Sequence, residues 1–171
     1  VFYQGDAIID IPFSRLNVQE KKFDLKTLTG AIISNTCDIA STNKRNITPY
    51  VNLAAIHRID EFSAYLKSTN ISDLKITEFV ENIRNNIVST LFYLPEIKSN
   101  GTIIFHESFI RFDETTSLSI EFLNEGKFDK NYIRNNGDRV YSFSNYGFYL
   151  FLFKLSVHFC RIRESVFIDS C

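Results

Sequence analysis

Tryptophan and methionine are absent from this chain of 171 residues, whereas phenylalanine occurs 17 times. We therefore expect a core made mainly of Phe, Ile and Leu side chains. Cysteine is also scarce, and the spacing of Cys37, Cys160 and Cys171 matches no zinc-binding pattern. The odd number of cysteines argues against a disulfide framework and favours a reduced, cytoplasmic compartment.

The chain also lacks an excess of charge of one sign and a long hydrophobic run. Its net charge is −1, so nucleic-acid binding would require a local basic patch. The most apolar segment, residues 146–159, is interrupted by Lys154 and His158 and is shorter than the roughly 20 residues of a membrane span. We recognise no signal peptide. We expect a buried helix here and no association with a membrane.

Three catalytic signatures are missing: a Gly-rich phosphate loop, a Gly-x-Ser-x-Gly elbow and a His-Glu-x-x-His helix. His106 and Glu107 point to opposite sides of an expected strand and do not form a metal pair. We therefore predict neither a metal nor a cofactor.

Length and hydrophobic patterning predict one α+β domain that spans residues 1–171. Residues 18–28 are charged and are expected to form a loop or a hairpin arm. Short apolar runs between turn residues predict strands over residues 2–13 (ending near Pro12), 30–35, 50–58, 90–94, 102–112 and 118–123.

Two helices are expected. Ser72 can cap a helix that runs to about Ser89, and Ser142 or Ser144 can cap a terminal helix that runs to about Arg163 and is buried on more than one side. The first helix has one apolar stripe, which consists of Leu74, Phe79, Val80, Ile83 and Ile87.

The order of these elements resembles the MazF/PemK group of plasmid-maintenance toxins, which are related to the CcdB toxins. Residues 4–8 resemble the Gly-Asp-hydrophobic first strand of that group, residues 30–35 and 51–57 its next two strands, and residues 102–113 a later strand. The resemblance implies a small SH3-like antiparallel β-barrel with an inserted helix and a buried C-terminal helix. The barrel core would cover about residues 1–123 and the C-terminal helical element about residues 140–165.

Members of this group cleave single-stranded RNA without metal, using an Arg before the second strand and a hydroxyl residue after the third. Here Thr29-Gly30 and His57 stand at those positions. Two hypotheses follow. The first is a small-barrel protein of a bacterial toxin–antitoxin or phage-defence system that binds a partner protein or nucleic acid. The alternative is a metal-independent endoribonuclease toxin with a substituted active site.

Cys37, Asp38 and His57 are the candidate catalytic residues. A catalytic thiol needs a nearby His or cation, and His57 titrates near neutral pH. We expect adjacent strands of the barrel to bring the three together. The alternative is a structural role, in which Cys37 is a small buried residue and Asp38 forms a turn.

A second set of residues is expected to bind nucleic acid or a partner. Basic and aromatic side chains together hold single-stranded RNA by phosphate contact and stacking, although the same residues can simply form a solvated loop. A partner protein, single-stranded RNA and a second copy of the chain all remain open as partners. The set consists of Asn35, Lys44, Arg45, Tyr50 and Arg58.

Overall fold

The computed structural model describes residues 2–39, 49–125 and 139–160. The strands are β1 (Ala7–Asn17), β2 (Lys22–Ile32), β3 (Tyr50–Arg58), β4 (Leu91–Leu94), β5 (Ile97–Ser99), β6 (Thr102–Phe105), β7 (Ser108–Ser119) and β8 (Arg139–Tyr141). The helices are α1 (Thr36–Ile39), α2 (Ile59–Ser68), α3 (Asp73–Arg84), α4 (Ile120–Glu125) and α5 (Asn145–Cys160).

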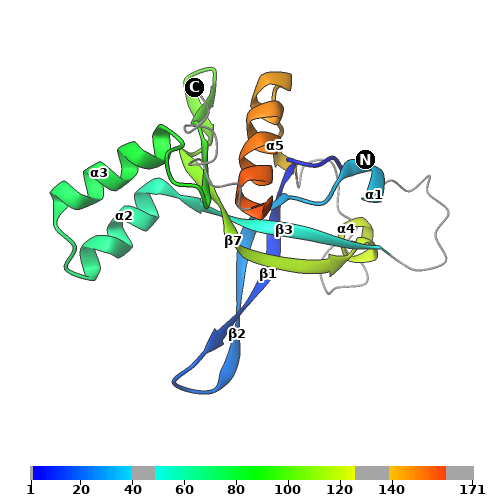
Figure 1. Ribbon diagram of the computed structural model, residues 1–171, viewed down its shortest axis with the longest axis horizontal. Helices are drawn as coiled ribbons and strands as arrows, with labels where there is room; N and C mark the ends of the chain where they lie inside the picture. Colours follow the sequence, from blue (N-terminus) through cyan, green and yellow to red (C-terminus); the bar gives the residue numbers. More distant parts are fainter. Residues whose placement is uncertain (1, 40–48, 126–138, 161–171) are drawn as a thin grey trace, which may run out of the picture.

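The fold is α+β and is built on one mostly antiparallel sheet, as the sequence predicted. The strand order is β4-β7-β3-β2-β1-β8, and β5 and β6 form a separate hairpin. Within the described residues β4 and β8 are edge strands that do not pair with each other, so the sheet is open where a closed barrel was expected. In Figure 1, α2 and α3 lie at one end of the sheet and α5 packs across it.

The first three strands follow one another as antiparallel neighbours. The expected bounds of β3, residues 50–58, are confirmed. The expected end of β1 near Pro12 is wrong, because β1 and β2 continue together as a long hairpin out to Asn17 and Lys22. Pro12 is tolerated there because β8 pairs only with Ala7 and Ile8, which leaves β1 with one neighbour at Pro12.

β7 is interrupted by a bulge that matters for the site. Ala54 of β3 pairs with Thr115, whereas Ala55 pairs with Arg111, so residues 112–114 lie outside the register. The expected strand 102–112 is in fact divided between β6 and β7, and the strand expected over 118–123 is wrong because α4 begins at Ile120. Bulges bend a strand and redirect its side chains.

The helix expected after Ser72 is present as α3, but it ends at Arg84 rather than near Ser89. Ser72 stands at the N-cap position without a side-chain capping hydrogen bond. The predicted apolar stripe of this helix is only partly buried: Ile83 is buried, whereas Leu74 and Ile87 are exposed. Sequence reasoning did not find α2, which begins directly after β3. Together α2 and α3 cover one end of the sheet through a cluster that includes Phe62, Phe79, Ile83, Leu91 and Phe109.

The terminal helix α5 is capped by Ser144, whose Oγ accepts a hydrogen bond from the Gly147 N–H. It buries Phe151 and Leu155 against the sheet. Phe153 is 70% exposed, so the described part of the helix is not buried on more than one side, as had been expected. Ile32 of β2 is fully buried, on the opposite side of the sheet from this helix, in the cluster around Leu53.

Candidate functional site

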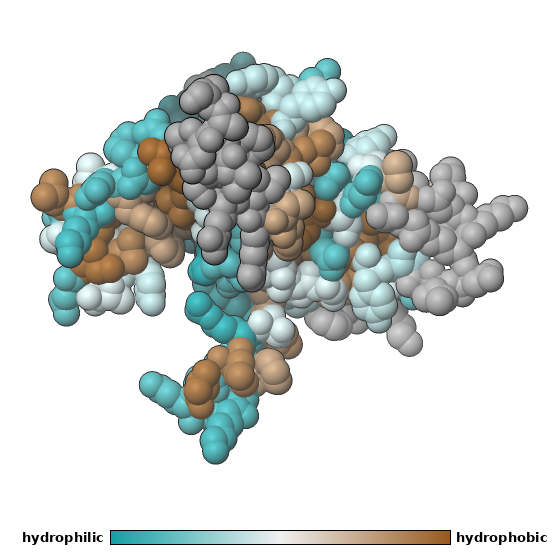
Figure 2. All heavy atoms as spheres, in the orientation of Figure 1, coloured by the Kyte–Doolittle hydropathy of each residue, from teal (hydrophilic) through white to brown (hydrophobic). Residues whose placement is uncertain are grey.

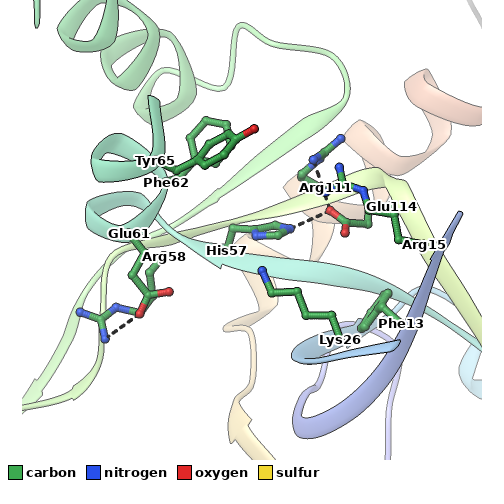
Figure 3. A pocket seen from close by; sticks show the side chains of 10 residues that line it. All are labelled: Phe13, Arg15, Lys26, His57, Arg58, Glu61, Phe62, Tyr65, Arg111 and Glu114. Carbon is green, nitrogen blue, oxygen red and sulfur yellow. Dashed lines mark hydrogen bonds and ion pairs between the residues drawn. The ribbon is translucent and has the colours of Figure 1, made fainter. Parts of the chain in front are cut away.

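A pocket of about 210 Å³ lies where the β1–β2 hairpin, the end of β3, the β7 bulge and α2 meet. Figure 3 shows its side chains, which come from elements far apart in the sequence. The lining consists of Phe13, Arg15, Lys26, His57, Arg58, Glu61, Phe62, Tyr65, Arg111 and Glu114.

His57 lies near the end of β3, and its ring stacks on Phe109, with ring centroids 5.8 Å apart. Its Nε2 atom is 2.8 Å from Oε2 of Glu114. Glu114 reaches the ring because it belongs to the β7 bulge, where the strand leaves the regular register with β3. The same carboxylate oxygen is 3.2 Å from Nη1 of Arg111, so the bulge presents a carboxylate and a guanidinium together.

Burial of the imidazole lowers the pKa of His57 below its ordinary value. The hydrogen bond and charge of Glu114 act in the opposite direction but do not offset burial, and the charges of Arg111 and Lys26 lower the pKa further. His57 is therefore neutral at pH 7 and donates its Nε2–H to Glu114. Its other ring nitrogen makes no hydrogen bond to a described residue, so it can accept a proton.

Four cations line the pocket, in two groups that differ in their ion pairing. Arg111 is paired with Asp113 and Glu114, and Arg58 with the exposed carboxylates of α2. Arg15 and Lys26 have no ion pair with any described residue. Both point into the pocket from one face of the β1–β2 hairpin (Figure 3). These two cations can therefore bind an anion without first breaking an ion pair.

Aromatic side chains form the wall that α2 contributes. Phe62 packs edge-on against Phe109, with centroids 5.2 Å apart, and so continues the core up to the pocket. Tyr65 lies one turn further along α2 and is 61% exposed at the pocket rim. An exposed aromatic ring beside unpaired cations is the combination that binds a nucleobase and its phosphate.

The structure does not bring Cys37 to His57. Antiparallel pairing places the end of β2 beside the beginning of β3, and the Ser34 N–H donates to the carbonyl of Asn52. His57 lies five residues further along β3, about 16 Å away in an extended strand. Cys37 is exposed in α1, and its N–H donates to the Asn35 side chain. This geometry separates Cys37 from the pocket.

The other expected site residues fall into three groups. Arg58 lines the pocket beside His57, whereas Asn35 and the exposed Tyr50 lie at the opposite end of β3, near Cys37. Lys44 and Arg45 lie outside the described residues, as does the side chain of Asp38.

Sequence reasoning found His57 and Arg58 but missed Arg15, Lys26, Arg111 and Glu114. No local motif marks these four. Residues 18–28 were expected to form a loop or a hairpin arm, which covers Lys26 but not Arg15. Only the observed register, which pairs Phe13 with Lys26, places Arg15 and Lys26 on one face of the hairpin.

The part of the chain that the structure describes contains no group of three His, Cys, Asp or Glu side chains placed to hold a metal ion. None of the described helices has both the length and the hydrophobicity required to span a bilayer. No protein-family model matches the chain, and a search of curated proteins finds no significant match.

Proposed function

We propose that the pocket around His57 binds the backbone of single-stranded RNA and cleaves it without a metal ion. The observation that carries the proposal is the hydrogen bond between His57 and Glu114. The two residues share the pocket with Lys26, a cation that has no ion pair with any described residue. A neutral His with a fixed tautomer is a general base, and an unpaired cation beside it provides a place for a phosphate.

The reaction that fits these groups uses the RNA itself as the nucleophile. The 2′-hydroxyl gives its proton to the unbonded ring nitrogen of His57 and attacks the adjacent phosphorus. The bond from phosphorus to the 5′-oxygen breaks, and the leaving oxygen takes a proton from the imidazolium or from water. Lys26 and Arg15 stabilise the charge that develops on the phosphoryl oxygens. The products are a 2′,3′-cyclic phosphate and a 5′-hydroxyl.

Tyr65 and Phe62 support RNA rather than an isolated phosphate as the ligand. Single-stranded RNA is held by stacking of its unpaired bases on aromatic rings together with phosphate contacts. The two carboxylates of the lining, Glu61 and Glu114, oppose an anion, but each lies against an arginine. The net charge of the lining is therefore positive, with four cations against two carboxylates.

We also propose that the chain is related to the SH3-like barrel toxins of the MazF/PemK type and acts in a bacterial toxin–antitoxin or phage-defence system. The support is the resemblance of residues 4–8, 30–35 and 51–57 to that group, together with the consecutive antiparallel order of β1, β2 and β3. Induced expression in bacteria tests this: a ribonuclease toxin arrests growth, and the His57→Ala variant does not.

The direct test incubates purified protein with mixed-sequence single-stranded RNA in the presence of chelator, at several pH values. Retention on a filter together with cleavage supports the proposal. Retention without cleavage would instead support the non-enzymatic alternative, a module that binds nucleic acid. With neither cleavage nor retention, the pocket has no role in RNA chemistry and a partner protein is the better explanation.

A further inference from the structure

Two charged side chains of the pocket, Arg58 and Glu61, lie beside each other at the start of α2. Nη1 of Arg58 is 3.3 Å from Oε1 of Glu61 (Figure 3). The other two guanidinium nitrogens, Nε and Nη2, donate to the two carboxylate oxygens of Asp60, with Nε 3.0 Å from Oδ1. This two-point contact fixes the plane of the guanidinium and leaves Nη1 as the nitrogen that contacts Glu61.

Arg58 and Glu61 therefore present three polar atoms in a defined order. Nη1 of Arg58 is a donor, the neighbouring Oε1 of Glu61 is an acceptor, and Oε2 of the same carboxylate is a second acceptor. The Watson–Crick edge of cytosine has the same order of donor, acceptor and acceptor. Guanine has the complementary order, because its O6 accepts and its N1–H and N2–H groups donate.

We propose that Arg58 and Glu61 select guanine in the RNA that the pocket binds. The N1–H and N2–H groups of guanine donate to the two oxygens of Glu61, and Nη1 of Arg58 donates to O6. Guanine selection rests on the proposed binding of RNA and goes further by naming the base that the pocket takes.

The other three bases fit this pair less well. Adenine places its N6 amino group against the Arg58 donor and the lone pair of N1 against Glu61. Cytosine has the same order of groups as the protein, so like polarities meet at every position. Uracil forms two of the three hydrogen bonds but places its O2 acceptor against Oε2 of Glu61. Such unfavourable contacts with the wrong ligand are the usual source of specificity.

Tyr65 provides a stacking surface beside the pair. It lies four residues after Glu61, so both side chains project from the same face of α2, and both line the pocket. Figure 2 shows that the surface is hollowed between α2 and the projecting β1–β2 hairpin, which leaves room for a base against this wall. Stacking tolerates any base, so Tyr65 contributes affinity whereas Arg58 and Glu61 contribute selectivity.

Uridine octamers with one variable base at a central position test the proposal. They are made as 2′-fluoro RNA, which lacks the attacking 2′-hydroxyl, and their binding to the whole chain is measured by fluorescence anisotropy in chelator. The octamer with guanine should bind about 10- to 100-fold more tightly than those with adenine or cytosine. Uracil and hypoxanthine, which lacks the N2 amino group of guanine, should give intermediate affinities.

Glu61→Gln tests the assignment to this side chain. It preserves the size of Glu61 but replaces one acceptor oxygen with a donor, and should reduce the ratio of guanine to adenine affinity about tenfold. The ratio is the readout because the loss of a negative charge strengthens the binding of every octamer alike. Glu78→Gln changes an exposed carboxylate of α3 outside the pocket and should keep the wild-type ratio. Circular dichroism verifies that both variants are folded.

The outcomes separate this proposal from the RNA proposal on which it rests. Equal affinities for the guanine and adenine octamers, or a preference for another base, would overturn guanine selection and leave RNA binding in place. A guanine preference that Glu61→Gln retains in full would also overturn it, because another group would then read the base. If none of the octamers binds, the RNA proposal fails and guanine selection fails with it.

Discussion

His57 and Glu114 are in hydrogen-bond contact, with Nε2 and Oε2 2.8 Å apart, although 57 positions separate them in the sequence. The contact depends on the bulge in β7, because in a continuous register β3 would face a different part of β7. It fixes the donor nitrogen of the imidazole and leaves the other nitrogen available to accept a proton. The proposed chemistry begins from this arrangement.

The titration of His57 is the first prediction. Its pKa should lie below the ordinary value of about 6.5, because burial disfavours the charged ring. Glu114→Gln should lower the pKa further, since Glu114 favours the protonated ring, whereas Lys26→Ala should raise it by removing a nearby positive charge. The measurement is an NMR titration of the imidazole resonances, with Lys75→Ala as the control. A wild-type pKa above 6.5 would contradict the neutral base.

RNA affinity is the second prediction. Lys26→Ala and Arg15→Ala should each weaken the binding of single-stranded RNA. Each should also reduce the slope of log affinity against log salt by about 0.7 per lost phosphate contact. Lys75→Ala removes an exposed lysine from α3, outside the pocket, and is the matched control. Equal affinities and slopes for Lys26→Ala and Lys75→Ala would exclude the pocket as the RNA site.

The packing of α5 gives a third prediction that compares two phenylalanines of one helix. Phe151 is completely buried, so Phe151→Ala should reduce the free energy of unfolding by about 3–5 kcal/mol. Phe153 is 70% exposed, and Phe153→Ala should change it by no more than about 0.5 kcal/mol. Chemical denaturation measures both variants. Similar losses for the two would show that the helix packs differently.

Local sequence patterns predicted the helices and strands whose formation depends on residues close together in the sequence. The strand over residues 50–58 was found because an apolar run follows Pro49, and the helix after Ser72 was found from its cap and periodicity. α2 was missed because no Gly or Pro separates it from β3. The open edges of the sheet depend on which strands pair, which one sequence does not show.

The candidate site was only half predictable. His57 and Arg58 were identified because they lie at the end of a predicted strand. Glu114 contacts His57 only because β7 has a bulge, and no Gly, Pro or Asn in that part of the sequence indicates the bulge. Cys37 was placed beside His57 by treating neighbouring strand ends as one site. In an antiparallel pair, the end of one strand adjoins the beginning of the next, so the two belong to opposite ends of β3.

We propose that His57 is the general base for cleavage of RNA bound in the pocket. The most direct measurement is the single-turnover cleavage rate of single-stranded RNA in chelator, compared between the wild type and His57→Ala at saturating protein. We predict a rate that is lower by about 10²–10⁴-fold in the variant, with RNA binding retained through Arg15 and Lys26. Equal cleavage rates for the two proteins would show that His57 is not the general base.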